Sequence, residues 1–244
     1  MINFKGMMCK AKAIFIIGLM IVMGACSFPG QEITVFSISF LFKDSDEGWT
    51  GDFADYPEGD SITYDLFYKH DTLPTNLNNK ATLKALHISG NNGSDDLFMF
   101  VKKKISGLKP NTTYLLLFNI KFASNAPTGA VGIGGAPGES VFVKAGASLV
   151  EPKKELQGGM YRMNINKGNQ AEEGTDMINI GHVGVAANTT AFTVVTRNNN
   201  SGNGFQITTD NAGEIWLVVG TDSGFEGPTT LYYTQVDVLF NQID

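Results

Sequence analysis

The sequence has little of what enzymes and nucleic-acid-binding proteins commonly rely on. Histidine occurs three times and cysteine twice among 244 residues, and the only arginines are Arg162 and Arg197. Catalysis needs a base, an acid or a nucleophile held in a pocket, and none of these histidines or arginines lies in a recognisable catalytic motif. Acidic residues outnumber basic ones by 24 to 18. The net charge of −6 opposes contact with nucleic acid, so we expect no such partner.

Long hydrophobic runs are also scarce, and the one that stands out lies near the N-terminus. It extends from Ala13 to Ala25 and follows Lys5, Lys10 and Lys12. A membrane-spanning helix needs about 20 apolar residues, so this run is too short to cross a bilayer. A basic segment followed by a short apolar run and small residues is typical of a secretory signal peptide.

The residues that end this run, MGAC at 23–26, resemble the lipobox of bacterial lipoproteins, in which a cysteine after two small residues is lipidated and becomes the new N-terminus. Cleavage before Cys26 removes Cys9 and leaves one cysteine with no disulfide partner. Lipidation gives that cysteine a role, whereas the alternative is an ordinary signal peptide with a chance cysteine. We expect a signal peptide at 1–25, an anchor linker at 26–32 and one domain at 33–244.

This organisation predicts an exported protein that is held at the bacterial cell envelope by an N-terminal lipid. Loss of the three lysines of the signal peptide changes the net charge from −6 to −9. The linker is short, so we expect the domain to lie close to the membrane. No acidic surface-export tag follows Cys26, which favours an orientation towards the periplasm, and we expect the anchor to lie in the outer membrane.

The exported part is rich in short runs in which apolar and polar residues alternate, which is typical of β-strands. Examples are VFSISFLF at 35–42, TYLLLFNIKF at 113–122 and LYYTQVDVLF at 231–240. Clusters of Gly, Asn, Asp and Pro separate the runs and predict turns. About a dozen strands and no convincing helix predict an all-β fold, a jelly-roll-like β-sandwich in a single domain. The alternative is two domains that divide near 151–159.

The same alternation assigns side chains to faces. In the last run, Asp237 is expected to point outward. The positions expected to face the core include both tryptophans and several residues of the last run: Trp49, Trp216, Tyr232, Val236, Val238 and Phe240. For Trp49, which follows Gly48, the alternative is a platform that stacks on a sugar ring.

Three segments resemble parts of jelly-roll domains of the galactose-binding and carbohydrate-binding-module type. FLFKDSDEGWT at 40–50 is similar to their first strand and acidic turn, ISGLKPNTTYLLLFNIKF at 105–122 to their Gly-Leu-x-Pro turn and core strand, and LYYTQVDVLF to their last strand. The resemblance implies that the first and last strands are neighbours. The middle segment also resembles fibronectin type III domains, in which Tyr114 would make a tyrosine-corner contact. The whole chain resembles bacterial lipoproteins to which no activity is assigned.

An acidic stretch, DSDEGWTGDFADYPEGD at 44–60, holds seven carboxylates and no basic residue. In the modules that the chain resembles, a structural Ca²⁺ often joins the acidic turn to the last strand, and calcium takes six to eight oxygen ligands. The resemblance implies a calcium site at Asp44, Asp46 and Glu47, joined by Asp237. The alternative is a solvated acidic loop, because the spacing matches no complete EF-hand motif.

Aromatic residues in loops rich in glycine and aspartate are candidates for stacking on sugar rings. Phe53, Tyr56 and Phe225 lie in such loops. Asp222 and Glu226 flank Phe225 and are placed to accept hydrogen bonds from sugar hydroxyls. These five residues are the predicted ligand-binding set.

The sequence leaves three functions open. We favour a lipid-anchored, non-catalytic β-sandwich that binds glycan and holds a structural calcium. The alternative is a structural or assembly subunit that binds a protein partner in the envelope. A polysaccharide-degrading enzyme is the least favoured, because no catalytic pattern is recognisable. A face lined with aromatic and amide groups would favour glycan binding, and a flat apolar patch would favour a protein partner.

The lipid anchor gives a direct test. Replacing Cys26 with Ala removes the thiol that would carry the lipid, so Cys26→Ala protein should leave the membrane fraction, and mass spectra of the wild type should show an acylated Cys26. A variant that stays with the membranes, together with an unacylated wild-type N-terminus, would contradict the assignment.

Overall fold

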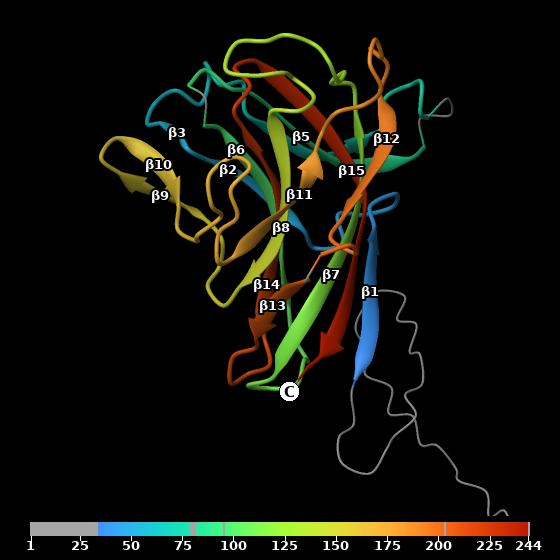
Figure 1. Cartoon of the computed structure of the whole chain (residues 1–244), viewed down its shortest axis with the longest axis vertical. Helices are drawn as coiled ribbons and strands as arrows, with labels where there is room; N and C mark the ends of the chain where they lie inside the picture. The colour runs from blue at the N-terminus through green and yellow to red at the C-terminus, as the bar shows by residue number, and fades with distance from the viewer. Residues whose placement is uncertain (1–33, 79–81, 95, 203, 244) are drawn as a thin grey trace, which may run out of the picture.

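The computed structural model describes residues 34–78, 82–94, 96–202 and 204–243, and it shows an all-β sandwich of antiparallel sheets (Figure 1). The fold class expected from the alternating runs is confirmed at this level. Cys26, the signal peptide and the linker lie outside the described residues. Among the residues described, no helix has the length and apolarity needed to cross a bilayer.

The larger sheet, sheet A, has the order β12-β7-β15-β5-β4, with β1 paired to β15 and β13 paired to β7. Its strands are β1 (Val35–Leu41), β4 (Phe67–Thr72), β5 (Lys84–Asn91), β7 (Thr113–Ser124), β12 (Thr193–Asn198), β13 (Phe205–Thr208) and β15 (Pro228–Gln242). The long strand β15 pairs with β5 through its first half and with β1 through its second half.

Sheet B faces sheet A and has the order β11-β8-β14-β6-β2. Its strands are β2 (Thr50–Ala54), β6 (Phe98–Ile105), β8 (Val141–Ser148), β11 (Met177–His182) and β14 (Ile215–Ser223). A small sheet C has the order β3-β10-β9. It is built from β3 (Tyr56–Pro57), β9 (Lys154–Gln157) and β10 (Met160–Met163).

The first and last strands are neighbours, as the sequence resemblance implied. β1 and β15 pair antiparallel, with Ile38 opposite Val238 and Phe40 opposite Val236. All four of these side chains are buried. The first and last strands therefore lie side by side in sheet A.

The core lies between sheets A and B and is formed by alternate residues of their strands. Trp49, 1% exposed, packs edge-on against Phe40 and Phe42, with ring centroids 5.4 and 6.1 Å away, so its expected place in the core is confirmed. The Tyr114 hydroxyl accepts a hydrogen bond from the Lys109 amide at 3.2 Å, which is the contact expected of a tyrosine corner.

Two expected core residues lie elsewhere. The pairing of β15 shifts register between Tyr233 and Gln235, so Tyr233 is fully buried and Tyr232 points outward. A bulge inserts one extra residue and reverses the alternation on one side of it. Trp216 is half-buried on the outer face of sheet B, with Lys102 Nζ 5.7 Å from its ring centroid.

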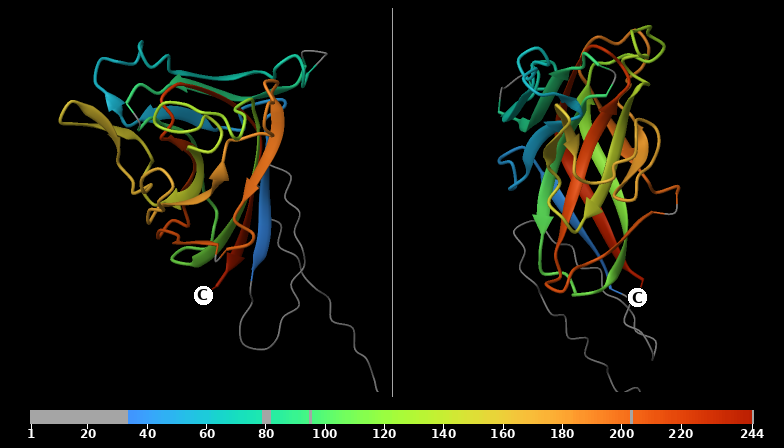
Figure 2. Two further views of the ribbon diagram at one scale, coloured as in Figure 1. Left: turned by 45° about the horizontal axis from the view of Figure 1, so that its top comes forward. Right: turned by 90° about the vertical axis from the view of Figure 1, so that its left-hand side faces the viewer.

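The outer face of sheet B is covered by the chain that follows β10. Ile165 from this segment packs with apolar residues of sheet B in a second, smaller cluster that also contains Ala54, Phe98, Phe100, Met177 and Val218. Figure 2 shows the β9–β10 hairpin and this segment on the side of the sandwich away from β1 and β12. The covered side of sheet B, unlike a solvated sheet face, can therefore bury charged groups.

Candidate functional site

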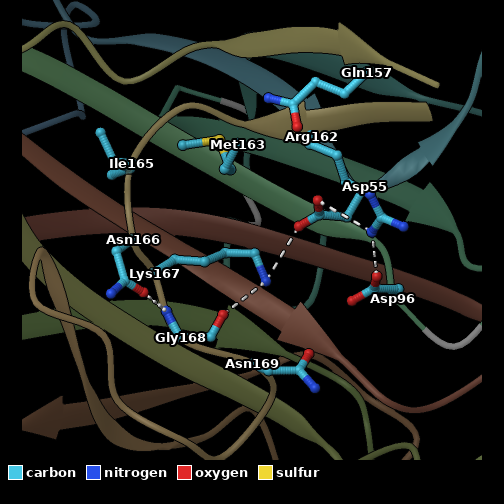
Figure 3. A pocket seen from close by; sticks show the side chains of 10 residues that line it. All are labelled: Asp55, Asp96, Gln157, Arg162, Met163, Ile165, Asn166, Lys167, Gly168 and Asn169. Atoms are coloured by element: carbon cyan, nitrogen blue, oxygen red, sulfur yellow. Dashed lines mark hydrogen bonds and ion pairs between the residues drawn. The ribbon is translucent and has the colours of Figure 1, made fainter. Parts of the chain in front are cut away.

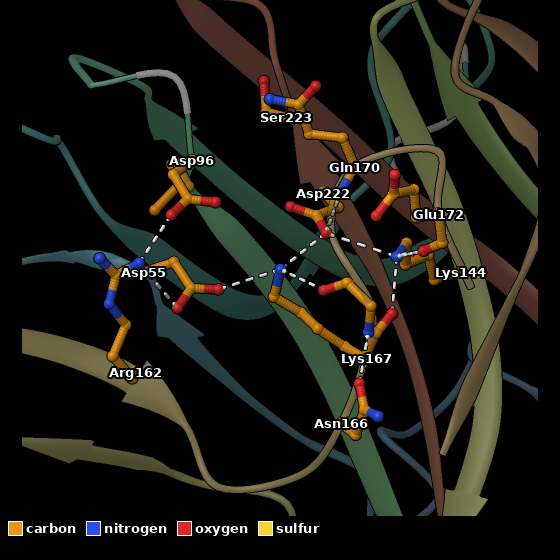
Figure 4. A network of polar contacts seen from close by, with 12 residues as sticks. Asp55, Asp96, Lys144, Arg162, Asn166, Lys167, Gln170, Glu172, Asp222 and Ser223 are labelled. Carbon is orange, nitrogen blue, oxygen red and sulfur yellow. Dashed lines mark hydrogen bonds and ion pairs between the residues drawn. The ribbon is translucent and has the colours of Figure 1, made fainter. Parts of the chain in front are cut away.

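Six charged side chains of alternating sign form a row in space on the outer side of sheet B (Figure 4). We call this row the charge chain. Their order is Asp96, Arg162, Asp55, Lys167, Asp222 and Lys144. The closest distances between successive nitrogen and oxygen atoms are 2.7, 3.6, 3.1, 2.7 and 3.5 Å. With three acids and three bases, the chain is balanced in charge.

Local backbone structure places Asp55 in the middle of this chain. Asp55 lies between β2 of sheet B and β3 of sheet C and has a φ of 62°, in the left-handed region. Its amide donates a hydrogen bond to the carbonyl of Tyr161 on β10. Non-glycine residues in this region are uncommon and tend to gather at functional sites. The kink turns the Asp55 carboxylate under the segment that covers sheet B.

The inner end of the charge chain is fully buried. Lys144 Nζ donates hydrogen bonds of 2.6 Å to the carbonyl oxygens of Lys167 and Glu172, and Asp222 accepts one of 2.9 Å from the Gln170 amide. Lys144 and Asp222 are 0% exposed. Burial lowers the pKa of Lys144, an effect that the neighbouring Asp222 opposes. These contacts fix residues 167–172 against β8 and β14.

The outer end of the charge chain opens into a cavity of about 390 Å³ (Figure 3). The side chains of Arg162 and Asp96 are 41% and 29% exposed there. Burial raises the pKa of Asp55, although the charge of Lys167 opposes this effect. The other residues that line the cavity are mostly amides and apolar side chains: Gln157, Met163, Ile165, Asn166, Gly168 and Asn169. Side chains of these types can hydrogen-bond a polar ligand and contact its apolar parts.

A second candidate surface lies on the outer face of sheet A. Phe67 of β4, His87 of β5, Tyr232 of β15 and Phe192 form a row of aromatic rings, which we call the aromatic row. Successive ring centroids are 4.8, 4.2 and 5.2 Å apart. Phe67 is 39% exposed and the other rings are half-buried. Burial lowers the pKa of His87, which favours an uncharged imidazole.

Polar side chains continue this face along β15, and we call them the polar ladder: Ser39, Asn119, Lys121, Gln235 and Asp237. Asp237 accepts hydrogen bonds from Ser39, Asn119 and Gln235 at 2.5, 3.0 and 2.7 Å. Gln235 in turn accepts one from Lys121 at 3.1 Å. The outward position expected for Asp237 is confirmed.

The structure separates the residues predicted to bind ligand. Phe53 and Tyr56 are 7% and 2% exposed, so burial excludes their rings as surface platforms. Asp222 is fully buried and faces Lys167 and Lys144 rather than solvent. Phe225 packs against the edge of the core, and the amide of Glu226, beside it, is bonded to the Ile133 carbonyl.

The residues proposed as calcium ligands are also apart. The Asp237 carboxylate lies on the outer face of sheet A and accepts hydrogen bonds from three side chains there. Asp46 instead accepts a hydrogen bond of 2.8 Å from the Gly48 amide within the turn. Asp44 lies 3.7 Å from Lys43 Nζ, and no hydrogen bond of the Glu47 carboxylate is present among the described contacts. Across the described residues no three His, Cys, Asp or Glu side chains are placed to hold a metal. Calcium binding stays a prediction without a preformed site.

Sequence reasoning missed the charge chain and the aromatic row. Lys144 alternates with Val143 and Ala145 along β8, and this pattern alone indicates a lysine that faces solvent. The lysine is buried because the 164–176 segment, distant in sequence, covers it. The aromatic row depends on the bulge that turns Tyr232 outward. One available signal was Arg162, because it is one of only two arginines in the chain.

Comparison with known proteins leaves the family open. No protein-family model matches the sequence, and no curated protein matches it. A similar solved structure, named as a sugar-binding protein of Bacteroides thetaiotaomicron, has 11% identity and a TM-score of 0.40 over 80% of this chain and 89% of that one. The mannan-recognising module TmCBM27 has 12% identity and a TM-score of 0.34, covering 88% of this chain and all of that one.

The enzymatically active domain of tailspike protein 4 from bacteriophage CBA120 is also similar, with 9% identity and a TM-score of 0.33. The match covers 80% of this chain but only 19% of that one. Similarities at this level establish neither a shared family nor a shared ligand.

The buried end of the charge chain predicts a stability effect. Lys144→Met removes a cation between Asp222 and two carbonyl oxygens, and breaking a buried pair in this way costs about 3 kcal/mol. For a domain of this size the melting temperature should fall by about 6 to 12 °C. Lys104→Met, which removes a half-exposed partner of Glu214, is the control and should leave melting nearly unchanged. Equal melting of the two variants would contradict a structural role for Lys144.

Proposed function

We propose that this protein is a lipid-anchored protein of the bacterial cell envelope that binds glycan without catalysis, through the outer face of sheet A. The observation that carries the proposal is the aromatic row beside the polar ladder. A sugar ring has apolar C–H faces and polar hydroxyl edges, so a surface that recognises it combines apolar rings with fixed hydrogen-bonding groups. The outer face of sheet A offers both.

Hydrogen bonds within the polar ladder hold its side chains in place. Asp237 is held by three side-chain donors, and Gln235 bridges it to Lys121. Groups that are fixed in place lose little conformational freedom on binding, which favours affinity. The uncharged His87 stacks on Tyr232 with an interplanar angle of 18°, so this pair presents a rigid apolar surface.

The position of the row suits an anchored protein. The N-terminal residue of β1, Val35, pairs with Asn241 at the far end of β15 from Tyr232. At about 3.3 Å per residue, Tyr232 lies about 30 Å along the strand from that point. A lipid on Cys26 would therefore hold the N-terminal end of β1 near the membrane and present the aromatic row away from it.

A protein partner is the second candidate function, and one observation favours it. Val131 and Ile133, in the segment between β7 and β8, are 99% and 72% exposed. Apolar side chains this exposed are common at protein interfaces, although two residues are a small patch. This function would be favoured if the wild type can be cross-linked to an envelope protein and Val131→Ser protein cannot, while the variant still binds glycan as the wild type does.

The glycan-binding proposal predicts a defined loss of affinity. The purified protein is run in native gels that each contain one polysaccharide from a panel of envelope and plant polysaccharides. At least one of them should slow its migration. Tyr232→Ala should weaken that binding about fivefold or more, because truncating a central aromatic contact typically costs over about 1 kcal/mol. Ile62→Ala, which removes an 89% exposed apolar side chain outside the row, is the matched control. If the polysaccharide retards Tyr232→Ala and Ile62→Ala protein equally, the aromatic row is not the binding site.

A further inference from the structure

The cavity at the outer end of the charge chain lies on the opposite sheet from the aromatic row and has features that the row does not explain. Asp55 comes from the β2–β3 kink, Asp96 from the segment before β6, and Arg162 from β10. Figure 3 shows the Arg162 guanidinium between the carboxylates of Asp55 and Asp96. Three separate elements therefore bring their polar groups to one opening.

Arg162 has hydrogen-bonding capacity that its protein partners leave unused. Its Nη1 donates to Asp96 Oδ2 at 2.7 Å and lies 3.6 Å from Asp55 Oδ1. A guanidinium carries five N–H groups in a planar fork, and the contacts with described residues use only Nη1. With its side chain 41% exposed, the rest of the fork is open to a ligand.

Asp55 supplies spare acceptor capacity beside these donors. The residue is 4% exposed and lines the cavity. Its Oδ2 is buried and lies 3.1 Å from Lys167 Nζ, so it is held in the ion pair. Its Oδ1 lies 3.6 Å from Arg162 Nη1 and accepts no hydrogen bond from the described residues, so this is the oxygen that can accept one from a ligand.

Neighbouring unused donors and acceptors suit a group that both donates and accepts. A hydroxyl does so, and two vicinal hydroxyls can accept from Arg162 while donating to Asp55 or Asp96. The balanced charge disfavours the alternatives, because an ammonium would meet Arg162 and Lys167, and a carboxylate would meet Asp55 and Asp96. Met163 and Ile165 provide an apolar wall for C–H groups.

We propose that this cavity is a second ligand site that takes a neutral, hydroxyl-rich ligand such as a hexose unit, through Arg162, Asp55 and Asp96. The site is separate from the aromatic row, so it binds a sugar whether or not the row does. If both sites are occupied, one molecule can hold two saccharide segments on opposite faces of the sandwich, which raises avidity without new contacts.

Methionine methyl groups report on the cavity directly. Met163 lines it, whereas Met99 is 1% exposed in the core between the sheets. The full chain, labelled with ¹³C at methionine methyl groups and held in detergent, is titrated with the methyl glycosides of galactose, mannose and glucose. At least one of them should shift the Met163 signal to saturation while Met99 stays unmoved. Glucuronate and glucosamine should bind at least about tenfold more weakly than the neutral glycoside that binds best.

Variants separate this site from the aromatic row. Arg162→Gln should remove the Met163 response, and so should Asp55→Asn, which retains a side chain that tolerates the left-handed backbone. Both proteins are first required to melt cooperatively. Tyr232→Ala should leave the response intact, even though it weakens polysaccharide retention by the row.

Two results would overturn the proposal. One is a Met163 signal that none of the neutral glycosides moves, and the other is equal or tighter binding of glucuronate or glucosamine. Either result leaves the row's polysaccharide binding untouched, because retention and its loss in Tyr232→Ala are measured independently. Conversely, a Met163 response in a protein that no polysaccharide retards would refute only the function proposed for the row.

Discussion

The charge chain on the outer side of sheet B is the interaction on which the second half of the structure depends. Lys144 and Asp222, both 0% exposed, hold the 167–172 backbone against two strands of sheet B. Buried charges are costly unless each meets partners of opposite sign, and here the two buried acids, Asp55 and Asp222, each lie between two bases. The charge chain thereby fixes the 167–172 segment on sheet B. Its outer members, Arg162 and Asp96, lie at the open cavity.

The two outer faces of the sandwich are consequently built on different principles. On sheet A the cross-strand stacking of His87 and Tyr232 and the hydrogen bonds to Asp237 order the side chains on the outer face of the strands. On sheet B an added segment and the small sheet C form a cavity above the strands. We therefore propose two separate sites, one on each outer face of the sandwich.

The alternation of apolar and polar residues predicted much of the fold. It identified the strands around 35–42, 113–122 and 231–240, whereas the pairing of the first with the last, which is observed, was implied by the resemblance to jelly-roll modules. Alternation is a local property, so it failed where a distant segment or a bulge intervenes. Tyr232 faces outward because of the register shift after Tyr233, and Lys144 is buried because 164–176 folds over it. Phe53, expected in a loop, belongs to β2 and is buried.

Hydrogen exchange at the backbone amides of 166–172 tests the central claim, that the charge chain holds this segment on sheet B. The account predicts that the Gln170 amide, bonded to Asp222 at 2.9 Å, is protected in the wild type nearly as well as the amides of β8 and β14. In Lys144→Met protein the protection of the Gln170 amide should fall by clearly more than that of the two strands, which lose only what the lower global stability takes from them. Rapid exchange of Gln170 in the wild type, or unchanged protection in the variant, would contradict the account.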